Sequence, residues 1–153
     1  YEKSLADFDT PYTPANMTIL AMKQSLQLIK DQTIETVWKE TSRRAAALRA
    51  GADAIGMPVY SKSPSDAVTA ILAPAGIDGQ ALYKTLGQKY GMTVAGGQDQ
   101  LKGKVVRFSH MGYVDAFDTL AQVSALEMAA RDLGAKFDIG AGVAAAQKVL
   151  AQA

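Results

Sequence analysis

Residues Leu101–Tyr113, LKGKVVRFSHMGY, decide the fold because they place one arginine, Arg107, inside a run that otherwise predicts a buried strand. Valine and phenylalanine residues beside the arginine favour a strand, and a glycine lies near each end of the run. A guanidinium near a core needs a partner, so Arg107 either meets an internal carboxylate or points into a cleft that receives a carboxylate ligand. An arginine of an edge strand that lies in solvent is the third interpretation, and these residues alone leave all three open.

Composition narrows the class of protein. The 153 residues fit one domain, residues 1–153, with a core of its own. With 16 Lys and Arg against 15 Asp and Glu, the net charge is +1, so we expect no nucleic-acid partner. We also find no apolar run near the roughly 20 residues of a membrane span, and expect no membrane partner. The lack of cysteine fits a cytoplasmic protein.

The first third of the chain predicts two helices after an extended start. Residues 1–12 carry mixed charges without a clear period, so we expect them to be extended. Thr13 and Pro14 then favour a helix start, with the threonine as N-cap. A second helix is predicted over residues 33–55, with Trp38 packed in the core. The first helix has an apolar face formed by Ile19, Met22, Leu26 and Ile29.

The remaining residues alternate short strands with helices. Predicted strands cover residues 58–60, 67–73, 92–95 and the run around Arg107. Predicted helices cover residues 79–90, residues 116–133 after an Asp115 N-cap, and most of residues 139–153. This order predicts an α/β fold, a two-layer sandwich in which helices cover one face of a small, mostly antiparallel sheet. The long helix is expected to have an apolar face formed by Phe117, Leu120, Val123, Leu126 and Ala130.

Three stretches carry a family resemblance. They are GGQDQLKGKVVRFSHMGY at Gly96–Tyr113, TPYTPANMTILAMKQSLQLI at Thr10–Ile29 and ETVWKETSRRAAALRAGADAIGM at Glu35–Met57. Their order and spacing resemble the carboxy-terminal part of class V pyridoxal-phosphate aminotransferases, in the alanine-glyoxylate and serine-pyruvate group. Some relatives in this group are named soluble hydrogenase small subunits. The resemblance implies the small domain of a fold-type I pyridoxal-phosphate enzyme.

The resemblance also implies that a large domain upstream of this chain supplies part of the active site. None of the lysines here lies in the family's lysine motif, so the lysine that forms the Schiff base is expected in a large domain, and this chain is expected to hold no catalytic residue. Residues 1–31 would link the two domains. The chain alone should therefore be inactive, with the apolar face of residues 19–29 exposed where the large domain packs.

The resemblance assigns roles to individual residues. It matches Arg107 to the arginine that binds the substrate's α-carboxylate, in a bidentate pair that fixes position and rotation. It matches Thr13 to a threonine that reaches the cofactor phosphate of the other subunit of a homodimer, with Thr10 and Tyr12 beside it. Alternatively, Thr13 only caps its helix, and the two roles can coexist. Strand alternation predicts that His110 points away from Arg107 and is structural.

The expected function is that of a transaminase with pyridoxal 5'-phosphate as cofactor. Its substrates would be a small amino acid, alanine or serine, and a 2-oxo acid, glyoxylate or pyruvate. Cysteine desulfurase chemistry is disfavoured because the chain has no cysteine, and nothing here could ligate a hydrogenase metal centre. The alternative is a stand-alone, non-enzymatic α/β module that binds a small carboxylate through Arg107 or pairs with a protein partner.

Overall fold

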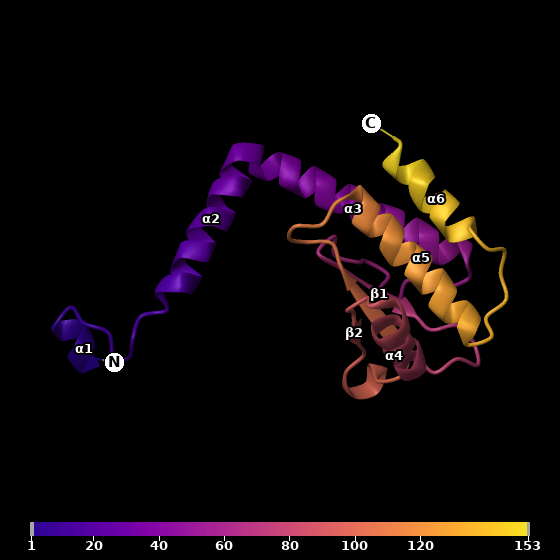
Figure 1. Ribbon diagram of the computed structural model, residues 1–153, viewed down its shortest axis with the longest axis horizontal. Helices are drawn as coiled ribbons and strands as arrows, with labels where there is room; N and C mark the ends of the chain where they lie inside the picture. The colour runs from indigo at the N-terminus through magenta and orange to yellow at the C-terminus, as the bar shows by residue number, and fades with distance from the viewer. Residues whose placement is uncertain (1, 153) are drawn as a thin grey trace. The chain divides into compact units, whose positions relative to one another are not determined.

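The computed structural model describes residues 2–152, and the chain divides after Trp38 into two compact units. The amino-terminal unit contains the helices α1 (Glu2–Ala6) and α2 (Asn16–Gln32) and the start of α3 (Ile34–Ala54) (Figure 1). The helix α1 contradicts the prediction that residues 1–12 are extended, because a short helical segment forms there before an irregular stretch.

The start of α2 corrects the predicted role of Thr13. Ala15 has φ −76° and ψ 58°, the angles of an inverse γ-turn, and the Asn16 amide donates to the Pro14 carbonyl at 2.8 Å. This turn makes Ala15 the N-cap, and no side chain caps the helix. Thr13 lies two residues before the cap position, so its predicted capping role is wrong.

The helix α3 matches the predicted second helix within two residues at each end. It ends where Gly56 adopts φ 73° and the Met57 amide donates to the Ala52 carbonyl at 2.9 Å. Trp38, however, is 64% exposed, so the prediction that it packs in the core is wrong. The buried stripe of α3 begins only at Ala45, one to two turns later.

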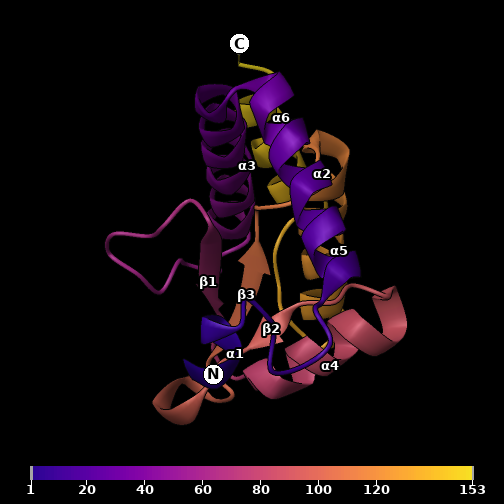
Figure 2. The same cartoon turned by 90° about the vertical axis from the view of Figure 1, so that its left-hand side faces the viewer.

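Three antiparallel strands form the sheet in the order β1-β3-β2. They are β1 (Val68–Leu72), β2 (Ala95–Gly96) and β3 (Val105–Ser109), with β3 between the other two in Figure 2. The strand that carries Arg107 is therefore central, and the edge-strand interpretation is wrong. The strand predicted at residues 58–60 is reduced to an isolated bridge between Val59 and Ile71.

Capping residues set the limits of the later helices. Asp78 accepts a bond from the Gln80 amide at the start of α4 (Gly79–Tyr90). Asp115 forms a capping box with Asp118 at the start of α5 (Ala116–Asp132). A short 3-10 helix, η1 (Asp99–Leu101), precedes β3, and α6 (Ala141–Leu150) ends the fold. The predicted helices in this part of the chain are confirmed.

One face of the sheet packs against helices in a single core, which confirms the predicted α/β sandwich. Phe117 does not belong to this core and is 80% exposed, contrary to the prediction. At about 100° per residue, Phe117 lies roughly opposite the buried side of α5. The core contains Leu48, Ile55, Ile71, Leu82, Leu86, Val106, Phe108, Val123, Leu126 and Ala146.

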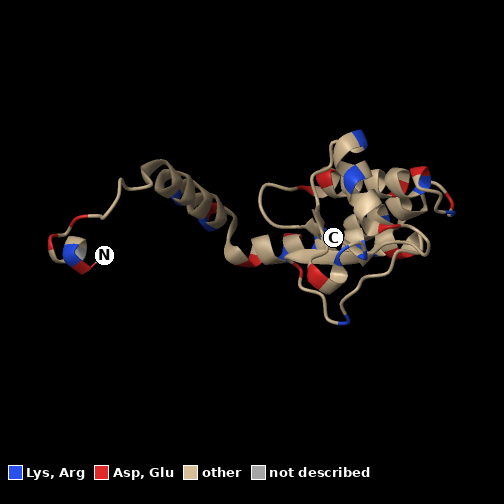
Figure 3. Ribbon diagram, turned by 90° about the horizontal axis from the view of Figure 1, so that it is seen from below, with Lys and Arg blue, Asp and Glu red and all other residues tan. Residues whose placement is uncertain are grey.

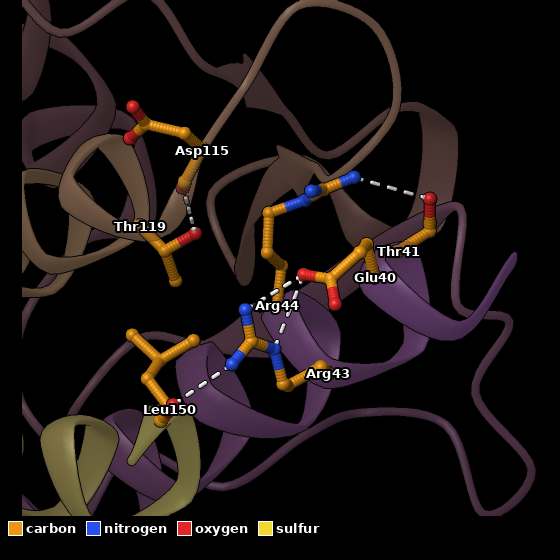
Figure 4. Close-up of polar contacts among 7 residues, drawn as sticks. All are labelled: Glu40, Thr41, Arg43, Arg44, Asp115, Thr119 and Leu150. Carbon is orange, nitrogen blue, oxygen red and sulfur yellow. Dashed lines mark hydrogen bonds and ion pairs between the residues drawn. The ribbon is translucent and has the colours of Figure 1, made fainter. Parts of the chain in front are cut away.

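The helix α6 is held at both ends by charged side chains from other helices. The buried carboxylate of Glu127 on α5 accepts bonds from the amides of Gly142 at 2.6 Å, Gly140 at 3.1 Å and Val143 at 3.2 Å. At the other end, Arg43 Nη1 donates to the Leu150 carbonyl at 2.9 Å (Figure 4). Both contacts suit the helix dipole, with the anion at the N-terminus and the cation at the C-terminus.

Candidate carboxylate-binding site

Arg107 lies between two alanines on the face of the sheet opposite the core. In an antiparallel pair, directly opposed side chains share a face, and Arg107 opposes Ala70 of β1 and Ala95 of β2. Its chain neighbours Val106 and Phe108 point the other way and are buried. Because both cross-strand neighbours are methyl groups, no long side chain stands directly beside the arginine on this face.

One bond within the chain orients the guanidinium. Arg107 Nε donates to the Gly96 carbonyl at 3.0 Å, and the side chain is half-buried. Within residues 2–152, the ion pairs join Arg43 to Glu40, Arg49 to Asp66 and Lys89 to Asp132, and none includes Arg107. No carboxylate of the described chain therefore pairs with Arg107, and its two Nη groups form the fork that binds a carboxylate bidentately.

The loop before β3 is a tight turn built on glycines. The Gly97 amide donates to the Val105 carbonyl at 3.1 Å, and a Cβ on Gly97 would lie 1.9 Å from the Leu101 carbonyl oxygen. Gly103 has φ 73°, in the left-handed region that favours glycine. These glycines allow the chain to turn sharply, and the turn begins directly after the Gly96 carbonyl that contacts Arg107.

His110 lies on the core face, as strand alternation predicts, and it is fully buried. Its Nε2 atom is 2.9 Å from Thr69 Oγ1, which also accepts a bond from Arg49 Nε at 3.2 Å. Burial, followed by the positive charges of Arg49 and Arg44, lowers the pKa of His110 to about 4. A neutral, buried imidazole away from Arg107 fits a structural residue.

The two threonines of the predicted phosphate site lie in the amino-terminal unit and differ in availability. Thr10 Oγ1 donates its proton to the Tyr12 carbonyl at 2.7 Å, while the Thr10 amide donates to Asp9. Thr13 is exposed. It precedes an α2 N-terminus that no side chain caps. A phosphate needs donors, so Thr13 and the first-turn amides of α2 fit it better than Thr10 does.

Sequence reasoning missed the group that orients Arg107 and the groups that hold the helices of the core together. The Gly96 carbonyl gives no sequence signal, because every residue has one. Glu127 does give a signal, since it is an acidic residue within the apolar run ALEMAA of α5. The pairing of Asp132 with Lys89 and Tyr90 joins two helices far apart in the sequence, which periodicity cannot predict.

The distribution of charge and hydropathy gives little further information about this site. Figure 3 shows basic and acidic residues on the same ribbon segments, and both signs occur on α3 and on α5. Among residues 2–152 no helix combines the length and hydropathy needed to cross a membrane. The same residues contain no group of three or more acidic, histidine or cysteine side chains placed to hold a metal ion.

Curated relatives match most or all of this chain but a minor part of their own length. A soluble hydrogenase small subunit from a Synechococcus species is 37% identical over 156 residues, covering 100% of this chain and 40% of the relative. A serine-glyoxylate aminotransferase from Hyphomicrobium methylovorum is 36% identical over 139 residues, covering 89% of this chain and 34% of the relative. The chain thus spans about two-fifths or less of these proteins, and no family model matches it.

Two solved structures of aminotransferases resemble this chain over nearly all of its length. Pyridoxamine-pyruvate aminotransferase from Mesorhizobium loti superposes with a TM-score of 0.85 at 32% identity, over 92% of this chain and 37% of that one. Ureidoglycine-glyoxylate aminotransferase from Bacillus subtilis gives a TM-score of 0.88 at 26% identity, over 97% of this chain and 40% of that one. The chain therefore belongs to the class V aminotransferases and corresponds to their small domain.

Proposed function

We propose that this chain is the substrate-carboxylate-binding domain of a pyridoxal-phosphate-dependent transaminase. The amino donor would be a small amino acid, alanine or serine, and the acceptor would be glyoxylate or pyruvate. The names of the relatives support this reaction class, since they pair serine, ureidoglycine or pyridoxamine with glyoxylate or pyruvate. The observation that carries the proposal is the half-buried Arg107, whose Nη groups have no carboxylate partner in residues 2–152.

The proposed role of Arg107 is to hold the substrate in one orientation. Two parallel bonds from the Nη groups would fix the α-carboxylate in position and rotation, which in turn fixes the direction of the Cα–H bond. Pyridoxal phosphate, when bound, withdraws electrons from the substrate α-carbon. The alanines at positions 70 and 95 leave room for the substrate carboxylate on this face.

The cofactor phosphate is proposed to contact the amino-terminal unit. The Thr13 hydroxyl and the first-turn amides of α2 would donate to it, with Thr10 in a lesser role. In a homodimer, these donors would contact the cofactor phosphate of the other subunit. We propose that the enzyme is such a homodimer and that it is cytoplasmic. The large domain, which would carry the cofactor lysine, is proposed to join this chain at residues 1–31 and to cover the apolar side of α2. Six large apolar side chains of α2 are exposed and support this proposal: Met17, Ile19, Leu20, Met22, Leu26 and Leu28.

The test is steady-state kinetics of the complete protein that contains this chain. Arg107→Gln removes the carboxylate fork, and Arg131→Gln is the matched control because Arg131 is exposed on α5. Losing a desolvated charge partner costs about 2 to 5 kcal/mol, so KM for alanine or serine should rise by about 30-fold or more. Arg107→Lys should restore little of this loss, because lysine lacks the planar fork.

Two results would contradict the proposal. One is an Arg107→Gln enzyme whose KM matches that of Arg131→Gln. The other is transamination at the full rate by the 153-residue chain alone, because the proposal assigns the cofactor lysine to the large domain.

A further inference from the structure

We propose that the main-chain carbonyl of Gly96 is a positioning group for Arg107, and that Gly97 fixes this carbonyl in place. The inference rests on the proposed function and specifies which edge of the Arg107 guanidinium binds the substrate carboxylate. The Gly96 carbonyl would thereby select one of two possible binding modes.

A guanidinium offers two edges to a carboxylate. Two parallel bonds can come from Nη1 and Nη2 at the end of the side chain, or from Nε and one Nη along its side. In this chain, the Arg107 Nε–H already donates to the Gly96 carbonyl at 3.0 Å. The side edge is therefore occupied, and the end edge remains for a substrate. An α-carboxylate would dock end-on.

The position of the Gly96 carbonyl depends on the strand pair and on the turn that follows. Gly96 opposes Val106 in the β2–β3 pair, and the Gly97 amide donates to the Val105 carbonyl at 3.1 Å. The chain then folds back through η1, which brings the Leu101 carbonyl against Gly97. The peptide that carries the Gly96 carbonyl is thus tied on its amide side to β3.

Gly97 is the residue at which this arrangement can be tested. An added Cβ would lie 1.9 Å from the Leu101 oxygen and 2.5 Å from its carbonyl carbon, so the backbone must shift. The shift would act on the peptide bond between Gly96 and Gly97, and hence on the bond to Arg107 Nε. Gly87, on the exposed side of α4, has no atom within 4 Å of the added Cβ and is the matched control.

The experiment compares Gly97→Ala, Gly87→Ala and Arg107→Gln in the complete protein, with alanine and with ethylamine as donors. Ethylamine lacks the carboxylate and reports on the rest of the active site. We expect Gly97→Ala to raise KM for alanine about tenfold, the loss of one hydrogen bond of roughly 1.4 kcal/mol. The rate with ethylamine should not change, and Gly87→Ala should leave both unchanged.

The outcomes separate this inference from the proposed function. If Arg107→Gln leaves KM for alanine unchanged, the proposed function fails. If Arg107→Gln raises KM but Gly97→Ala behaves like Gly87→Ala, the inference alone fails. An equal loss with both donors would also overturn it, because that result indicates general damage to the site.

A measurement on the unmutated protein covers the case in which Gly97→Ala does not fold. The Arg107 Nε–H should exchange with solvent at least about tenfold more slowly than that of exposed Arg131, because it is hydrogen-bonded and half-buried. NMR of the ¹⁵N-labelled complete protein measures both rates. Equal rates would overturn the inference.

Discussion

Replacing Glu127 by alanine should lower the free energy of unfolding, because it weakens the attachment of α6 to α5. The substitution removes the carboxylate that accepts bonds from three amides at the start of α6. The Gly142 amide is buried, so it would lose its partner without gaining water. Leaving a buried donor unsatisfied costs about 1 to 3 kcal/mol, and bonds to a charged group are at the upper end of the range.

The three bonds do not contribute equally. The amides of Gly140 and Val143 are half-buried and can recover part of their loss from water, so we assign them about 0.5 to 1 kcal/mol each. Together with Gly142, the free energy of unfolding should fall by about 3 to 4 kcal/mol in Glu127→Ala. Glu127→Gln keeps one acceptor oxygen but turns an NH₂ group toward the Gly140 amide, so its loss should be about half as large.

Urea unfolding followed by circular dichroism measures both changes. The control is Lys84→Ala, a substitution of an exposed residue in the middle of α4, which should stay within about 0.5 kcal/mol of the unmutated chain. A Glu127→Ala chain within about 1 kcal/mol of this control would refute the reasoning, since it would mean that the carboxylate does not stabilise α6.

Three further predictions concern stability. The pKa of His110 is about 4 in the fold and 6.5 when unfolded, so its destabilising effect is absent above pH 6.5, grows as the pH falls and is complete near pH 4. The full effect is a loss of about 3 kcal/mol in the free energy of unfolding, which urea unfolding at several pH values would detect. His110→Gln should abolish this loss. The same dependence of the free energy of unfolding on pH in both chains would contradict the prediction. Gly142→Ala should lower the melting temperature, because the new Cβ would lie 2.7 Å from Glu127 Oε1 and from the Gly51 carbonyl. In Gly87→Ala the Cβ meets open space on a helix, so the free energy of unfolding should rise by about 0.5 to 1 kcal/mol, and the same sign in both variants would contradict the packing argument.

The parts of the fold that the sequence predicts are those with a local physical cause. Asp78 and Gly91 set the two ends of α4 where the sequence places them, because an N-cap and a left-handed C-cap act within one turn. The strand of Arg107 is equally predictable from its apolar residues. The partner of Arg107 Nε is not, because it comes from a main-chain carbonyl on the neighbouring strand.

The wrong predictions have a common cause in signals that fit two structures. Thr13-Pro14 is typical of a helix start, yet here the proline leads into the γ-turn at Ala15. Trp38 and Phe117 are apolar at helical spacing, and both are exposed. Periodicity reports that a residue is apolar but not whether its own chain or another surface covers it.

The central claim is that Arg107 holds the carboxylate of an amino donor in a transaminase. The direct measurement gives the complete protein ¹⁵N-labelled alanine or serine together with glyoxylate or pyruvate, and follows the label by mass spectrometry. We predict labelled glycine from glyoxylate or labelled alanine from pyruvate, and a rate about 30-fold or more lower in Arg107→Gln at subsaturating donor. An unmutated protein that transfers no label to either acceptor, or an Arg107→Gln protein that transfers it at the full rate, would contradict the claim.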